Sequence, residues 1–175
     1  MLKLLIQMQI RKGEKKDMKA VLELIQELAI FEKEPNAVDL SVSDLERDGF
    51  GDTPLFHTFV AEVNFDKKGS SIDPKIVGIA LYYYRYSTWK GKTIHLEDLI
   101  VKENSRGSGF GFALFSRIIE QGKIDSVRRI EWSVLDWNVG AINFYKKSGA
   151  KIMEDWRMAQ LDEKGINEFL IKLNN

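Results

Sequence analysis

Residues 94–115, which read IHLEDLIVKENSRGSGFGFALF, decide the fold of this chain. The first eight are mostly apolar and predict a strand, and the last residues begin an amphipathic helix with an apolar stripe of Leu114, Phe115, Ile118 and Ile119. Between them, three glycines in residues 106–111 leave backbone N–H groups accessible at a helix N-terminus. This order predicts an anion-binding loop, beside the simpler interpretation that the glycines only permit a tight turn.

Two common nucleotide-binding motifs do not fit the loop. A dinucleotide fingerprint requires its third glycine at position 112, which is Phe112. A phosphate-binding loop of nucleotide hydrolases requires Gly-Lys followed by Ser or Thr, which is absent. Both of these nucleotide-binding interpretations therefore fail.

The rest of the chain predicts a mixed α+β fold. Beyond the helix that follows the glycine loop, expected helices cover residues 16–31, 41–49 and 138–148, and residues 64–75 form a polar surface loop. Expected strands cover residues 8–12, 56–63, 76–86, 93–101 and 129–135, with two weaker strands around 151–154 and 157–161. Residues 93–135 contain at least one parallel strand–helix–strand crossover.

Composition narrows the function classes. A length of 175 residues fits a single domain over residues 1–175, in which residues 1–7 are an extension. Lys and Arg number 26 and Asp and Glu also 26, so no net positive field favours nucleic acid or anionic lipid. With no cysteine, two histidines and no run of about 18 apolar residues, we expect no metal, no membrane span and a cytoplasmic location.

Four motifs are informative when taken together: Leu96–Val101, Arg106-x-x-Gly109-x-Gly111, Trp137-Asn138 and the run NFYKKSGA at 143–150. This combination resembles the GNAT family of acetyl-CoA-dependent N-acetyltransferases. Within the family, the chain is most similar to the diamine acetyltransferases of the spermidine/spermine type and their thialysine Nε-acetyltransferase branch. The resemblance implies the family fold, a mixed and mostly antiparallel central sheet with helices on both faces. It also implies acetyl-CoA as co-substrate and a homodimer.

The resemblance assigns cofactor contacts along the chain. The amides of Arg106, Gly107, Ser108, Gly109, Phe110 and Gly111 would bind the pyrophosphate of coenzyme A. Leu99, Ile100 and Val101 would pair with the pantetheine arm through their backbone, and Phe144 and Lys147 would contact the cofactor. Asn138 would contact pantetheine while also serving as a helix N-cap, and Tyr145, two helical turns later, would lie beside the sulfur as general acid. A buried structural role is the alternative for Tyr145.

The acceptor residues implied by the resemblance are acidic and aromatic. Glu97 would bind the amine or act through water as base, and Phe31 and Glu32 would help to hold a cation, although Glu32 alone fits an exposed charge. Because neighbours on a regular strand leave opposite faces, Asp98 is expected on the other side of the sheet. Either Glu154 or Asp155 would make a further substrate contact, which the short loop 151–155 leaves open.

The expected reaction is direct acetyl transfer from acetyl-CoA to the primary amine of a small cationic substrate. Thialysine- or lysine-like amines are favoured over polyamines because Ser87 stands where the polyamine branch carries an Asp. Two alternatives stay open. One is a GNAT enzyme that acetylates a protein lysine or N-terminus, and the other is a catalytically weak CoA-binding module.

Overall fold

The computed structural model describes residues 8–65 and 71–173, so the extension expected at residues 1–7 lies outside the described residues. The chain divides into two compact units, residues 1–133 and residues 134–175. Among the described residues, no helix is both long enough and apolar enough to cross a bilayer.

The first unit is built on one five-stranded sheet. Its strands follow the chain order β1 (Met8–Lys12), β2 (His57–Phe65), β3 (Ser71–Ser87), β4 (Gly91–Val101) and β5 (Ile130–Glu131). The first four pair antiparallel, whereas β4 and β5 pair parallel. This confirms the mixed, mostly antiparallel sheet.

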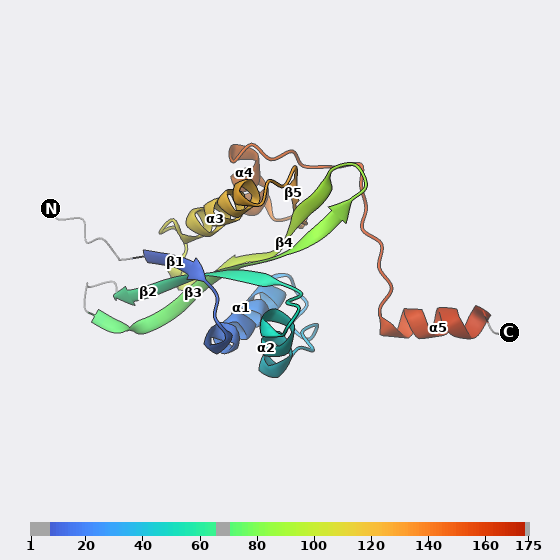
Figure 1. Cartoon of the computed structure of the whole chain (residues 1–175), viewed down its shortest axis with the longest axis horizontal. Helices are drawn as coiled ribbons and strands as arrows, with labels where there is room; N and C mark the ends of the chain where they lie inside the picture. The colour runs from blue at the N-terminus through green and yellow to red at the C-terminus, as the bar shows by residue number, and fades with distance from the viewer. Residues whose placement is uncertain (1–7, 66–70, 174–175) are drawn as a thin grey trace. The chain divides into compact units, whose positions relative to one another are not determined.

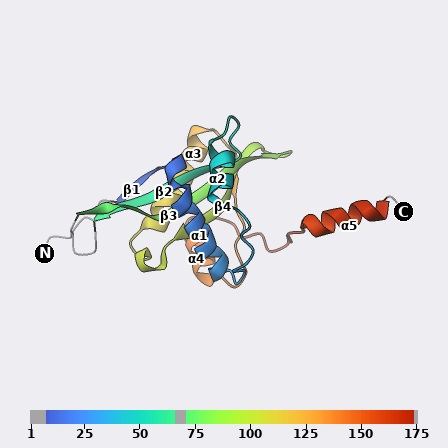
Figure 2. The same ribbon diagram turned by 90° about the horizontal axis from the view of Figure 1, so that it is seen from below.

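One face of the sheet is covered by α1 (Met18–Phe31) and α2 (Val42–Phe50), as Figures 1 and 2 show. The core on this face joins buried side chains of both helices to the sheet: Met18, Val21, Leu24, Leu45, Val60, Ile79 and Ile100. The helix expected at 41–49 is confirmed as α2 and begins with a capping box: the Asp44 amide donates to Ser41 Oγ at 3.2 Å, and the Asp44 carboxylate accepts from the Ser41 amide.

The opposite face is covered by α3 (Phe110–Ile124), which lies on the other side of the sheet in Figure 1. Phe110, Leu114, Phe115 and Ile118 are buried, whereas Ile119 is exposed, so the predicted stripe is one residue too wide. Gly78 lets this helix approach closely, because a Cβ there would lie 3.1 Å from Leu114 Cδ1. Helices therefore cover both faces, as expected.

The second unit contains α4 (Val139–Lys147) and α5 (Glu163–Leu173). The predicted helix 138–148 is confirmed, and so is its N-cap, because Asn138 Oδ1 accepts from the Ala141 amide at 3.1 Å; Gly149 follows the helix with a φ of 89°. The sequence analysis did not predict α5.

Three strand predictions were wrong or too long. The strand expected at 129–135 is only Ile130–Glu131, because this edge segment pairs with β4 at two residues only. The segments 151–154 and 157–161 are not strands, since in the described chain no neighbouring strand pairs with them. The loop expected at 64–75 is shorter, because β2 extends to Phe65 and β3 begins at Ser71, while residues 66–70 lie outside the described residues.

Candidate active site

A β-bulge interrupts β4 at Glu97. Leu81 of β3 pairs with Asp98, but its neighbour Tyr82 pairs with Leu96. The backbone of Glu97 is therefore skipped in the pairing between β3 and β4. Asp98 therefore shares the face of its partner Leu81, which is also the face of Ile79 and Ile100 under α1.

Glu97 lies on this same face. Its Oε2 is 3.5 Å from Nε2 of His95, and His95 pairs with Tyr83, two residues beyond Leu81 on β3. The prediction that Glu97 and Asp98 leave opposite faces was therefore wrong, because it assumed unbroken alternation. The bulge brings both carboxyl groups to one side of the sheet.

Glu32 joins these two residues to form an acidic cluster, which we define as Glu32, Glu97 and Asp98. The pKa of Asp98 is raised to about 7, first by burial and then by the negative charges of Glu97 and Glu32. The pKa of Glu32 is also raised, because its carboxyl is partly buried although the residue is exposed overall. Glu97 is exposed to solvent, with 51% of its side chain accessible. The cluster suits a ligand with a positive charge.

Next to the acidic cluster, β4 has an open edge. Leu99, Ile100 and Val101 pair with Ala80, Ile79 and Gly78 on one side, but within the described chain β5 reaches only Ile94 and His95 on the other. The backbone of residues 99–101 can therefore accept another extended chain as a neighbour. This is the position that the sequence analysis gave to pantetheine.

The glycine loop follows this edge through a short 3₁₀ turn, Glu103–Ser105. Gly107 and Gly109 have φ angles of 78° and 88°, a region that L-residues rarely adopt, and a Cβ on either would meet no atom within 4 Å. The first hydrogen bond of the helix joins α3 to this loop: the Ala113 amide donates to the Gly109 carbonyl at 3.0 Å. The amides just before it at the start of α3 have no intrahelical acceptor, so the loop can receive an anion from open space.

Arg106 anchors this loop to the end of β4. Its Nε donates to the carbonyl of Val101 at 3.0 Å, and its guanidinium lies 5.8 Å from the centre of the Phe31 ring. Phe31, the last residue of α1, therefore lies near the loop, and Glu32 follows it directly. The predicted residues of the first unit are thus brought together: the loop, the strand edge, Phe31, Glu32 and Glu97.

The remaining predicted residues lie in the second unit. Tyr145 is only 7% exposed, its ring contacts that of Phe144 at 5.3 Å, and burial raises the pKa of its hydroxyl to about 12. Asn138 and Tyr145 share a face of α4 at two turns' separation, and Lys147 ends the helix. Glu154 and Asp155 are exposed in a turn of the same unit.

The sequence profile of the acetyltransferase (GNAT) family matches residues 19–150. The chain belongs to this family. Members use acetyl-CoA as co-substrate. The open strand edge and the loop of α3 fit its extended arm and its phosphates, so the acetyltransferase has the two features that this co-substrate requires.

Comparisons with individual proteins agree. The acetyltransferase is 38% identical to a thialysine N-epsilon-acetyltransferase from Bos taurus, over 91% of this chain and 95% of the relative. It is 36% identical to spermidine/spermine N(1)-acetyltransferase-like protein 1 from Homo sapiens, over 90% of this chain and 23% of the relative. An integron cassette protein from Vibrio cholerae has the same fold, with a TM-score of 0.72 and 21% identity over 93% of this chain and 97% of that structure.

The sequence analysis missed Asp98 as a member of the site. A signal was present: two polar residues in succession, Glu97 and Asp98, interrupt a strand whose other inner residues alternate or are apolar. Such a break is typical of a bulge, where two neighbours can share a face.

Proposed function

We propose that the chain transfers the acetyl group of acetyl-CoA to the primary amine of a small cationic substrate. The observation that carries the proposal is the acidic cluster, two of whose members, Glu97 and Asp98, lie on β4, the strand that also presents the open edge and leads into the glycine loop. An anionic co-substrate and a cationic acceptor would thus meet along one strand.

The co-substrate contacts we propose follow the geometry of the loop and the edge. The amides of residues 106–111 would hold the pyrophosphate, and the backbone of Leu99–Val101 would pair with pantetheine as an added strand. Asn138, Phe144 and Lys147 of α4 would complete the contacts to the cofactor. These roles require backbone access more than particular side chains at 99–101.

Glu97 is the proposed base. An alkyl ammonium with a pKa of ~10.4 is neutral in only about one molecule in 10³ near pH 7, so a proton must leave before attack. Glu97 is exposed enough to receive it directly or through water, whereas Asp98 and Glu32 would hold the positive charge nearby. The neutral amine would then attack the thioester carbonyl, forming the C–N bond as the C–S bond breaks.

Tyr145 is the proposed donor to the departing sulfur. Because burial raises the pKa of its hydroxyl to about 12, Tyr145 stays protonated at neutral pH and can donate a hydrogen bond. A thiol with a pKa of ~8.5 is already a fair leaving group, so this donor would assist rather than control the reaction. No covalent enzyme intermediate is required, which suits a chain with no cysteine.

The acceptor we propose is lysine-like, with thialysine preferred over spermine. The similarity to the thialysine enzyme supports this, as does Ser87, which carries no charge for a long polycation. The Ser87 hydroxyl accepts from the amides of Trp89 and Lys90, both at 3.2 Å, so it serves the β3–β4 turn. Phe31 and either Glu154 or Asp155 would add substrate contacts.

A screen of acetyl-CoA-dependent thiol release tests the proposed function. The panel contains thialysine, lysine, ornithine, putrescine, spermidine and spermine, with a lysine-containing peptide as the protein-like acceptor. We expect the highest kcat/KM for thialysine or lysine. A higher value for spermine would overturn the substrate preference, and turnover of the peptide alone would overturn the small-amine assignment.

We also propose how the chain is organised in the cell. The family profile crosses the boundary at residue 133, which supports one acetyltransferase domain made of both units. Exposed apolar residues of α5, among them Ile166 and Phe169, support a homodimer. The absence of cysteine fits the reducing cytoplasm, and the balanced charge supports partners other than nucleic acid or membrane.

A further inference from the structure

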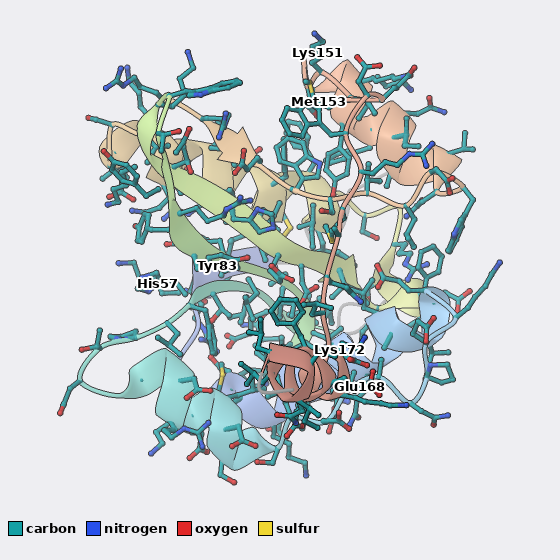
Figure 3. The ribbon with its side chains drawn as sticks, turned by 90° about the vertical axis from the view of Figure 1, so that its right-hand side faces the viewer. His57, Tyr83, Lys151, Met153, Glu168 and Lys172 are labelled. Atoms are coloured by element: carbon teal, nitrogen blue, oxygen red, sulfur yellow. The ribbon has the colours of Figure 1, made fainter. Side chains whose placement is uncertain are left out.

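Behind Glu97, a line of polar side chains crosses the same face of the sheet. His95 lies between Glu97 and Arg85: its Nε2 is 3.5 Å from Glu97 Oε2, and its Nδ1 is 3.1 Å from Arg85 Nη1. Only 13% of the His95 side chain is exposed. Its ring packs on that of Tyr83, with centroids 5.2 Å apart, and Figure 3 labels Tyr83 on the sheet.

The contact with Arg85 fixes the tautomer of His95. A guanidinium has donors only, so Arg85 Nη1 must donate and Nδ1 of His95 must accept with its lone pair. An imidazole that accepts at Nδ1 carries its proton on Nε2. That nitrogen is the one that faces Glu97.

Arg85 is held in place from the far side. The same Nη1 that meets His95 lies 3.0 Å from Glu131 Oε1, and the other carboxylate oxygen of Glu131 is 2.8 Å from Arg129 Nε. Glu131 also pairs with His95 in the parallel ladder between β4 and β5. The guanidinium is therefore oriented by a carboxylate before it meets the imidazole.

We infer that His95 is a positioning residue, held neutral with its proton on Nε2 by Arg85 and directing that N–H at the carboxylate of Glu97. The inference rests on the proposed function of Glu97 as base. It implies that the proton taken from the substrate does not continue to His95, because Nδ1 is occupied by Arg85.

The charges around His95 agree with a neutral ring. The pKa of His95 is lowered, first by burial and also by the positive charge of Arg85, against the opposing charges of Glu97 and Glu131. Tyr83 faces the same carboxylate, and the pKa of its hydroxyl is raised by burial and then by a hydrogen bond to Glu97. The Glu97 carboxylate therefore faces both Tyr83 and a neutral His95.

The tautomer can be measured without any activity. The chain has two histidines, so a His57→Gln variant assigns both sets of imidazole ¹⁵N resonances. We expect His95 at pH 7.5 to show the shifts of the neutral Nε2–H form, and Arg85→Met to raise its pKa and mix the tautomers. Arg85→Lys, which retains a donor, should preserve the parent pattern. A protonated ring or an Nδ1–H tautomer in the parent would overturn the inference.

Kinetics test the effect on Glu97. His95→Phe keeps an aromatic ring against Tyr83 but removes the N–H, so we expect kcat with the best amine to fall by about tenfold or more. The acidic limb of the kcat/KM profile should move to higher pH, because the ionised carboxylate has lost a donor, while acetyl-CoA affinity stays at the parent value. His95→Gln, whose Nε2 can still donate, should recover most of the rate and the parent profile.

The variants distinguish a failure of the positioning role of His95 from a failure of Glu97 as the proposed base. If His95→Phe is folded and matches the parent in rate and pH profile while Glu97→Gln is impaired, the positioning role of His95 is wrong and the proposed base stands. If Glu97→Gln has full activity, the proposed base is wrong, and the tautomer measurement still decides the state of His95. If His95→Phe does not fold, the comparison of His95→Gln with the parent replaces it, and a lost rate or shifted profile there contradicts the inference.

Discussion

At the scale of single residues, Asp98 is the least ordinary carboxyl of the molecule. Burial and the neighbouring charges of Glu97 and Glu32 raise its pKa to about 7, so it holds a proton at pH values where an exposed aspartate is ionised. A bound ammonium group would reverse this by favouring the ionised form. A cationic substrate bound beside Asp98 would therefore favour the release of its proton.

This state of Asp98 predicts a pH-dependent gain in stability from Asp98→Asn. Between about pH 4, where an unfolded aspartate ionises, and pH 7, the folded state binds more protons, so its free energy of unfolding decreases as pH rises. The neutral amide removes that loss. At pH 8 we expect the free energy of unfolding to exceed that of the parent by up to a few kcal/mol, at about 1.4 kcal/mol per pKa unit, and the Tm to be higher; at pH 4 we expect no gain.

Thermal unfolding from pH 4 to 8 checks this expectation, with Glu120→Gln on the exposed face of α3 as the matched control. The control should follow the parent curve. A Tm difference between Asp98→Asn and the parent that is the same at every pH would contradict the raised pKa.

The second prediction at this scale concerns Glu97. Glu97→Gln keeps the shape of the side chain but neither accepts a proton nor attracts an ammonium group, so kcat/KM for the best amine should fall by about 10²-fold or more. Acetyl-CoA affinity should stay unchanged, as measured by calorimetric titration. Glu120→Gln is again the control, and equal amine kinetics in both variants would assign the base to another group.

The sequence predicted Glu97 but misplaced Asp98, and the reason is physical. The alternation of a strand depends on its pairing register, and an unpaired residue changes that register without requiring a glycine or proline to mark it. The loop was predictable from its glycines between a strand and a helix, whereas Phe31 and Glu32 were predicted only from the resemblance to the GNAT family. Contacts such as that between Arg106 and Phe31 depend on packing between distant segments, so no local pattern contains them.

At the scale of elements, the glycine loop connects backbone conformation to cofactor binding. Gly109 is the N-cap of α3 and has a φ of 88°, whereas Gly111 lies inside the helix, where a Cβ would meet only Val101 Cγ2 at 3.9 Å. Position 109 therefore requires a residue that adopts a positive φ, whereas position 111 does not, although the two glycines look alike in the sequence.

This contrast predicts different effects from the same substitution. Gly109→Ala forces an L-residue into the left-handed region at a cost of roughly 1–2 kcal/mol, so the loop should rearrange and acetyl-CoA affinity should fall by at least tenfold. Gly111→Ala should keep the affinity and match or exceed the parent in Tm, because alanine favours a helix over glycine. Calorimetry and thermal unfolding measure both, and parent-like affinity in Gly109→Ala would exclude the loop from the cofactor site.

Elements with strong end signals were predicted well, and others were not. Ser41 with Asp44, and Asn138 with Gly149, mark helix ends that the structure confirms. The helix α5 had similar signals, because Asp162 accepts from the Gly165 amide at 2.7 Å and apolar residues recur three and four apart. Residues 151–161 have a strand-like composition, but a strand also requires a partner, which composition does not specify.

At the scale of the whole molecule, the homodimer that we propose depends on α5. Ile166, Phe169, Leu170 and Leu173 recur on one stripe of the helix and are exposed, whereas Lys164 and Glu168 form an ion pair at 3.8 Å on another. Figure 3 labels Glu168 and Lys172 on this helix. An exposed apolar stripe of this kind is typical of a protein interface.

We therefore expect Phe169→Glu to weaken self-association. A carboxylate placed in an apolar interface loses hydration without a partner, so the dimer dissociation constant should rise at least tenfold. Lys172→Glu adds the same group beside the polar stripe and is the matched control. Sedimentation velocity over a concentration series measures both, and identical behaviour of the two variants would show that α5 takes no part in the assembly.

The bulge at Glu97 also has a consequence for how this enzyme can diversify. It divides β4 into two stretches, residues 91–96 and 98–101, that pair with β3 in different registers. The first stretch carries His95, whose Nε2 lies 3.5 Å from Glu97 Oε2, while the second begins at Asp98 and carries the edge proposed for the acyl donor. Since each stretch has its own register, we expect a lineage to exchange residues 91–96, and with them the side chains next to Glu97, while residues 99–101 keep their pairing with β3 and their open edge.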